Sequence, residues 1–97
     1  MKYRIIYLPR AIIDRDEIKT YLSNYYSSTA RKFFKLLKER TNQLKEFPYS
    51  CPVYQDEPNY RILIVDNYLV FYIVDEKSKV IEIHRIFHSS QDIIRYL

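Results

Sequence analysis

The stretch that decides the fold is YRILIVDNYLVFYIVDEKSKVIEIHRIF, residues 60–87. It holds three segments rich in Ile, Val, Tyr and Phe: Tyr60–Val65, Tyr68–Val74 and Lys79–Phe87. Such residues favour strands. Asp66 and Asn67 form a two-residue hairpin turn, because Asp and Asn tolerate positive φ better than most residues. Residues 75–78 make a second turn. The stretch therefore predicts a three-stranded antiparallel meander.

Two helices are predicted before the meander. From Ala11 to about Asn24, apolar residues recur at roughly helical spacing, namely Ile12, Ile13, Ile18, Tyr21 and Leu22. Residues 27–29 supply N-cap candidates for a second helix, which ends before Pro48. Its apolar positions follow the i, i+3, i+4, i+7 pattern, namely Ala30, Phe33, Phe34, Leu37 and Leu44. We expect the two helices to form a hairpin.

The two ends of the chain complete the predicted order. Residues Lys2 to Leu8 are β-rich, and Pro9 ends the pattern. Near the C-terminus, Ser and Asp capping signals precede Ile93, Ile94 and Leu97, which predicts a short terminal helix. The order predicts one α+β domain over residues 1–97, with the helical hairpin on one face of a mostly antiparallel sheet.

Composition excludes several function classes. The sequence has 97 residues, 47% of them apolar, and lacks a long apolar run or an N-terminal signal pattern, so we expect a cytoplasmic protein without a membrane association. It has no glycine, which excludes a Gly-rich phosphate loop. One cysteine, Cys51, and two histidines are a poor basis for a metal site. We therefore expect neither a metal nor a cofactor.

The charge balance is basic, with a net charge of +4. This balance suits a polyanionic target or an acidic partner. The second predicted helix carries many of the cations: Arg31, Lys32, Lys35, Lys38, Arg40 and Lys45. We interpret most of this run as a solvated helix face.

Candidate site residues lie in the strand-rich half. Period-two alternation places Arg61 with Leu63 and Val65, a set that we expect to lie on the sheet face away from the helices. The candidates for acid–base chemistry and anion binding are Arg61, His84, Arg85 and His88, with Tyr72 and Tyr96 as supporting hydroxyls. Histidine is the natural acid–base group near neutral pH, and arginine can bind phosphate through two donors.

Structural roles compete with these assignments. Arg61 can pair with Asp56 or Glu57, and Arg85 can pair with Asp92. Likewise, His84 can pair with Glu82, and His88 can act as a cap or packing residue.

A family resemblance adds to this interpretation. The segments that carry it are Tyr3–Ala11, Phe47-Pro48, Tyr60-Arg61, Tyr68–Tyr72 and Ile83–His88. In order and approximate spacing they resemble the landmarks of the RelE/ParE superfamily of toxins. The resemblance implies a growth-inhibiting toxin of a type II toxin–antitoxin system. A cognate antitoxin, which we expect to be acidic, would neutralise it.

The superfamily divides by target, and two features bear on the choice. RelE-like members cleave mRNA in the ribosomal A site and often carry an arginine where this chain has Leu69. ParE-like members act on DNA gyrase, and their Arg-x-x-His pattern resembles Arg85 to His88. We therefore interpret the chain as a toxin that acts on gyrase. The alternatives are a ribosome-dependent mRNA endoribonuclease using Arg61, Arg85 and His88, and a non-toxic nucleic-acid-binding family member.

Overall fold

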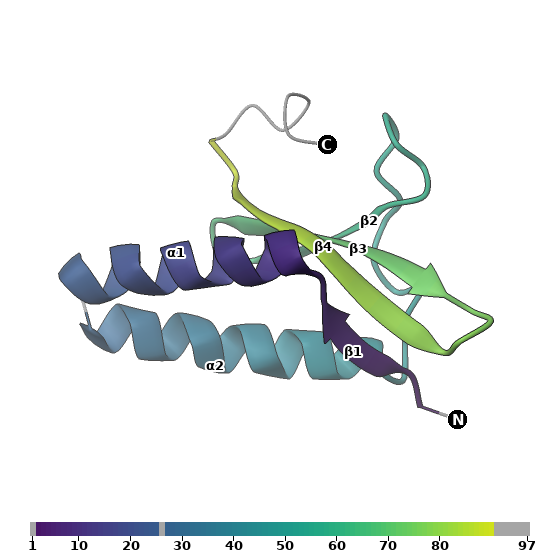
Figure 1. The fold of residues 1–97 in the computed structure, drawn as a ribbon, viewed down its shortest axis with the longest axis horizontal. Coiled ribbons are helices and arrows are strands. Elements are labelled where there is room, and N and C mark those ends of the chain that lie inside the picture. The colour runs from purple at the N-terminus through teal and green to yellow at the C-terminus, as the bar shows by residue number, and fades with distance from the viewer. Residues whose placement is uncertain (1, 26, 91–97) are drawn as a thin grey trace.

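The computed structural model describes residues 2–25 and 27–90, which form two helices and a four-stranded sheet (Figure 1). The elements in order are β1 (Arg4–Tyr7), α1 (Pro9–Tyr25), α2 (Ser27–Leu44), β2 (Arg61–Val65), β3 (Tyr68–Asp75) and β4 (Val80–His88). This order confirms the strand, two helices and three strands expected from the sequence. The expected C-terminal helix lies outside the described residues. Neither described helix is long and apolar enough to cross a membrane.

The sheet is mixed, with the strand order β1-β4-β3-β2. The pairs β2–β3 and β3–β4 are antiparallel, as the predicted meander requires. In contrast, β1 runs parallel to β4, with Arg4 opposite Val80. The first strand is shorter than expected, because α1 already begins at Pro9. The last bond from this segment to β4 is the one that the amide of Leu8 donates to the carbonyl of Ile83 at 2.9 Å. A segment from the start of the chain therefore lies beside its last described strand.

Both predicted turns are present without glycine. Asp66 takes a φ of 52° between β2 and β3. In the second turn, the amide of Ser78 donates to Oδ1 of Asp75 at 3.1 Å, and Lys79 takes a φ of 56°. Because Lys79 adopts this left-handed conformation, the following strand starts at Val80, one residue later than expected.

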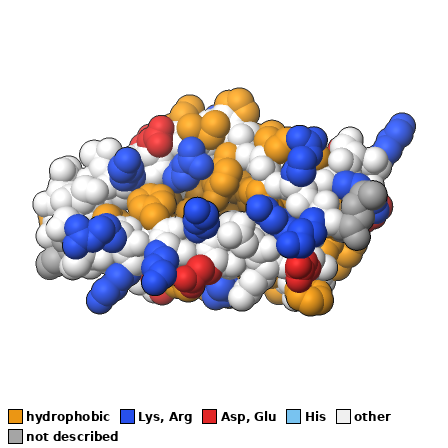
Figure 2. All heavy atoms as spheres, turned by 90° about the horizontal axis from the view of Figure 1, so that it is seen from below, with side chains coloured by type: hydrophobic (Ala, Val, Ile, Leu, Met, Phe, Trp, Pro, Cys, Tyr) orange, Lys and Arg blue, Asp and Glu red, His pale blue; other side chains and the backbone are white. Residues whose placement is uncertain are grey.

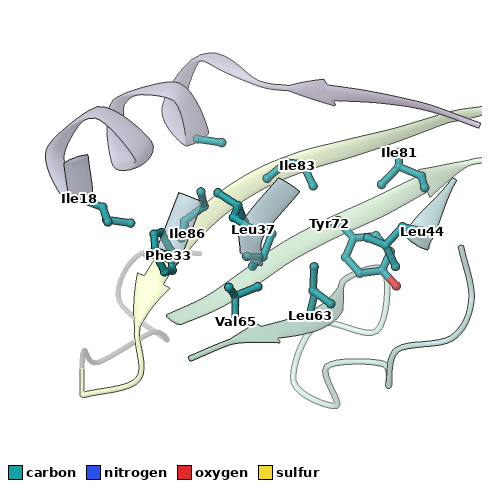
Figure 3. Packing of buried hydrophobic residues seen from close by; sticks show 12 residues of the cluster. Ile18, Phe33, Leu37, Leu44, Leu63, Val65, Tyr72, Ile81, Ile83 and Ile86 are labelled. Carbon is teal, nitrogen blue, oxygen red and sulfur yellow. The ribbon is translucent and has the colours of Figure 1, made fainter. Parts of the chain in front are cut away.

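The hydrophobic core lies between the helices and one face of the sheet. The two helices lie side by side on this face, with α1 against β4 and α2 against β2 (Figure 1). Helix α2 contributes Phe33, Leu37 and Leu44, as its apolar spacing predicts, and β2 contributes Leu63 and Val65 (Figure 3). The core of α2 therefore agrees with the expected spacing, and β2 buries alternate residues.

The buried side of α1 agrees with the expected one in part, because Ile18 is buried and Leu22 packs against the core. Ala11, Asp14 and Ile18 are buried, whereas Ile13 and Tyr21 are 52% and 59% exposed. The helical spacing was right, but α1 is apolar on more than one side. The position of the acidic residue Asp14 selects the side that packs, because its carboxylate bonds to β4.

The expected position of Arg61 was wrong. Arg61 does share a face with Leu63 and Val65, but this face is the one that packs on the helices. Its neighbour in β3 on this face is Tyr72, which belongs to the same core. The error arose because the two alternating sets of β2 are about equally apolar, so alternation could not decide which set faces the helices.

The other face of the sheet is aromatic at its centre. A register shift opposite Phe71 and Tyr72 interrupts the pairing of β3 with β4. Phe71 and Phe87 are buried, and Tyr54 and Tyr60 from the segment before β2 pack on Phe71 at ring distances of 5.2 and 6.1 Å. The cationic open face that the sequence suggested is therefore largely a second, smaller aromatic cluster.

Candidate functional site

A groove runs between α1 and the ends of β3 and β4. It encloses about 970 Å³. Its described lining residues are Asp14, Glu17, Ile18, Tyr21, Leu22, Tyr25, Asn67, Tyr68, Arg85, Ile86, Phe87, His88 and Ser90. Two of the predicted site residues, Arg85 and His88, therefore lie in one groove.

An ion pair joins the two walls of this groove. Arg85 donates Nε to Oδ2 of Asp14 at 2.8 Å and Nη2 to Oδ1 at 3.1 Å, and the amide of Ile86 donates to Oδ2 at 2.9 Å. The two side chains are only 13% and 10% exposed. Such two-pronged geometry is among the stronger hydrogen-bonding arrangements in proteins. The carboxylate therefore fixes α1 to β4 where the groove begins.

The fold explains why an acid is needed at this position. Strand β1 ends at Tyr7, opposite Ile83, so β4 continues beyond its neighbour. A buried backbone amide without a partner costs stability. Asp14 accepts a hydrogen bond from one such amide, that of Ile86.

Sequence reasoning missed Asp14. A signal was present, because Asp14 falls at the i+3 position after Ala11 and four residues before Ile18, on the packed side of α1. The partner suggested for Arg85, Asp92, lies outside the described residues. The guanidinium of Arg85 also lies over the ring of Phe87, 4.5 Å from its centre.

His88 lies at the end of β4, on the groove wall. Its Nδ1 is 2.6 Å from Oγ of Ser90 and accepts the Ser90 amide at 3.1 Å. Its ring meets that of Tyr68 edge-on at 5.2 Å. Burial raises the pKa of Tyr68 above its ordinary value. Because Nδ1 acts as an acceptor, the proton of the neutral imidazole belongs on Nε2.

Arg61 secures a loop. Its Nη1 donates to the carbonyls of Cys51 at 2.7 Å and Tyr49 at 3.3 Å, and its guanidinium lies 5.0 Å from the centre of the Tyr49 ring. Within the described residues it forms no ion pair with Asp56 or Glu57. Arg61 thus holds the segment between α2 and β2.

Tyr72 is also committed to this loop. Its hydroxyl donates to the carbonyl of Pro48 at 2.9 Å. Burial, together with the nearby Cys51 side chain, raises the pKa of Tyr72. The hydroxyl is therefore a buried structural donor. Tyr96, the other hydroxyl considered, lies outside the described residues.

The distance along the sheet separates Arg61 from the groove. Arg61 is opposite Tyr72, whereas His88 is opposite Tyr68, four residues away along β3. At about 3.3 Å per residue, this corresponds to roughly 13 Å along the strand, before the width of the sheet is added. The structure thus brings Arg85 and His88 together and leaves Arg61 apart from them.

His84 has the structural contacts that the sequence suggested. Its Nε2 lies 3.2 Å from Oε1 of Glu82, and its Nδ1 lies 3.3 Å from the hydroxyl of Tyr60. These contacts place His84 on the aromatic face of the sheet, outside the groove. The described part of the chain also contains no cluster of three or more His, Cys, Asp or Glu side chains that could hold a metal ion.

Tyrosines form the rim of the groove on α1. Tyr21 and Tyr25 are 59% and 66% exposed, and their rings lie 5.0 Å apart. Tyrosine and arginine are enriched in protein–protein interfaces, where they offer a large contact area with a polar end. The groove thus has the composition of a binding surface.

Comparisons with known proteins agree with this geometry. A family model described as the ParE toxin of the type II toxin–antitoxin system parDE matches residues 5–93. A structure of the chromosomal ParDE system from P. aeruginosa superposes with a TM-score of 0.74 at 19% identity, over 90% of this chain and 96% of that one. The toxin–antitoxin complex RelBE2 from Mycobacterium tuberculosis superposes with a TM-score of 0.66 at 13% identity, over 91% and 99%. No curated protein matches this sequence.

Proposed function

Because this chain belongs to the ParE toxin family of type II toxin–antitoxin systems, we propose that its toxicity is directed at DNA gyrase. The observation that carries the proposal is that the guanidinium groups of Arg61 and Arg85 already have hydrogen-bond partners within the protein. Asp14 and two loop carbonyls engage the guanidinium groups of Arg85 and Arg61, at separate places in the fold.

Cleavage of RNA makes demands that this arrangement does not favour. A nuclease must stabilise the charge that develops on the phosphorus and supply an acid–base pair at the same place. Arg61 lies roughly 13 Å along the strand from the level of His88. Leu69, where a cation would be expected in a nuclease, is an apolar strand residue opposite Ile64. These positions support a toxin that acts by binding.

The groove is the surface that we assign to the target. It combines exposed tyrosines on α1 with Arg85 and His88 on β4. The Asp14–Arg85 pair makes both walls rigid, which lowers the entropy cost of binding. In this proposal His88 and the exposed tyrosines are binding residues, Arg85 joins the two walls through Asp14, and Arg61 maintains the loop before β2.

The partner that neutralises the toxin is a cognate antitoxin. Both structural neighbours are toxin–antitoxin systems, which supports this assignment. The net charge of +4 favours an acidic antitoxin, because opposite charges increase the rate of encounter and the specificity of association.

A ribosome-dependent endoribonuclease is the second candidate. One observation favours it, namely that Arg85 and His88 share a groove. This function would require His88 to act on the RNA with Arg85 nearby, and Arg61 to contribute from a distance.

Induced expression without the antitoxin separates the two candidates. The gyrase proposal predicts growth arrest with a DNA-damage response and unchanged mRNA ends. A reconstituted translation assay serves as the second arm, and new mRNA ends in the ribosomal A site would overturn the proposal. Coexpression of the antitoxin is the control, and it should restore growth.

A further inference from the structure

Helix α2 carries Arg31, Lys35 and Lys38 along one side, and Lys45 follows directly after its last residue, Leu44; we call these four residues the basic row. At about 100° per residue, the three helical positions fall within about 60° of one another around the helix axis. The row is about 21 Å long at 1.5 Å per residue. Figure 2, a view from below Figure 1, shows Lys and Arg side chains spread over this face with few Asp and Glu.

The basic row is largely unneutralised. Arg31, Lys35 and Lys38 are exposed, Lys45 is partly exposed, and none of the four forms an ion pair within residues 2–25 and 27–90. One carboxylate on α2, Glu39, lies beside it. The chain has 16 Lys and Arg against 12 Asp and Glu, so its net charge is also positive.

A cleft with both polar and apolar lining adjoins the row. Lys38 and Lys45 line a space of about 300 Å³ between α2 and β1, together with Arg15 of α1. Thr41 and Asn42 supply further polar side chains there. The positive surface therefore extends sideways from α2 and includes a cation from the other helix.

We propose that the basic row binds the sugar–phosphate backbone of duplex DNA. About 21 Å of duplex axis presents about six phosphates per strand, a spacing that a row of this length can follow. Lysine binds phosphate as a point charge and does not read base sequence, so this contact is sequence-independent. The choice of DNA over another polyanion rests on the proposed function, because DNA is the substrate of gyrase.

In this proposal the toxin contacts its target through two surfaces. The groove between α1 and β4 contacts the enzyme, and the row on α2 contacts the DNA that the enzyme holds. The two surfaces lie on different elements, so one toxin molecule can use both.

Fluorescence anisotropy with a labelled duplex of about 20 base pairs tests the contact directly, using the full-length toxin without gyrase. Four phosphate contacts predict an affinity that falls about 150-fold between about 50 mM and about 200 mM salt. The variant Lys35→Gln/Lys38→Gln should lower this loss to about 12-fold. The control Lys19→Gln/Lys77→Gln removes the same charge from exposed positions outside the row and should keep the steep salt dependence.

The possible outcomes are distinct. If both double variants weakened DNA binding equally, the affinity would depend on net charge alone, and the proposal would be overturned. Tighter binding to a duplex RNA of the same length, or to an acidic peptide, would overturn the assignment to DNA. If the row binds DNA while gyrase is not inhibited, the inference stands and the proposed function fails. If gyrase is inhibited but the row variant binds DNA like the control, the proposed function stands and the inference about the basic row fails.

Discussion

At the scale of single residues, the pair of Asp14 and Arg85 has the greatest effect on the site. It connects residues 71 positions apart and is almost buried. Periodicity places Asp14 on the packed side of α1, but it cannot name the partner, because the partner comes from β4. Contacts between distant segments of the chain are therefore the part of the site that the sequence alone did not predict.

Removing Asp14 should destabilise the protein strongly. In Asp14→Ala, Arg85 keeps its buried position without its carboxylate, and the amide of Ile86 loses its acceptor. Breaking a buried pair costs about 3 kcal/mol or more. Urea unfolding should show this loss. Asp16→Ala, at an exposed position on the same helix, should change stability by less than about 0.5 kcal/mol. Similar losses in both variants would contradict the role given to Asp14.

Substitutions of the two histidines test which surface of the toxin binds gyrase. His88→Ala should reduce gyrase inhibition without unfolding the protein, because His88 lines the groove at the end of β4. His84→Ala is the matched control, since His84 lies with Tyr60 on the aromatic face. Inhibition and circular dichroism should be measured on both variants. Equal inhibition by the His88 variant and the wild type would remove His88 from the binding surface.

Glu76 should make stability depend on pH in the acid range. Hydrogen bonds from Lys79, Tyr3 and Tyr49 lower the pKa of Glu76 to about 2, from an ordinary value of 4.5. A group whose pKa is lowered by folding contributes stability above its unfolded pKa, and this contribution is lost as the pH falls through the folded pKa. The same hydrogen bond to Glu76 raises the pKa of Tyr49 to about 12.

The expected result is a melting temperature that falls as the pH drops from about 4.5 to about 2. Glu76→Gln should have a lower melting temperature at neutral pH and a weaker dependence in this range. Thermal unfolding followed by circular dichroism gives both quantities. An unchanged pH profile in Glu76→Gln would show that the carboxylate does not stabilise the fold.

At the scale of elements, local patterns were good predictors of type and poor predictors of orientation. The apolar spacing of α2 and the hairpin at Asp66 agree with the structure. For β2 the type was right and the packed side was wrong. For α1, Ile18 and Leu22 pack as expected while Ile13 and Tyr21 are exposed, because both elements are apolar on more than one side. Which of two apolar faces packs in the core depends on tertiary contacts, and a local sequence pattern holds no information about these contacts.

The hairpin turn offers a test at this scale. Asp66 adopts positive φ, which costs a residue with a Cβ about 1 kcal/mol or more unless its side chain helps. Asp66→Gly should therefore be more stable than Asp66→Ala by about 1 kcal/mol. Chemical denaturation measures the difference. At Asn67, where φ is not positive, the same pair of substitutions should show no gain for glycine. A gain of the same size at both positions would contradict this account of the turn.

At the scale of the whole molecule, the fold separates three surfaces. The groove lies between α1 and β4, the basic row follows α2, and the aromatic cluster covers the other face of the sheet. Composition predicted a basic protein, and the sequence placed many of its cations on the second helix; the structure shows which of them share one side. The order of elements predicted the family fold, because consecutive strands joined by short turns pair in only a few ways. The parallel pairing of β1 with β4 needed the three-dimensional structure.

The central claim is that this toxin inhibits gyrase and does not cleave RNA. The most direct measurement is the supercoiling of relaxed plasmid by purified gyrase with increasing amounts of purified toxin. Supercoiling should stop at toxin concentrations that leave mRNA intact in a reconstituted translation reaction, and adding the antitoxin should restore it. Full supercoiling at concentrations that cleave mRNA would contradict the account.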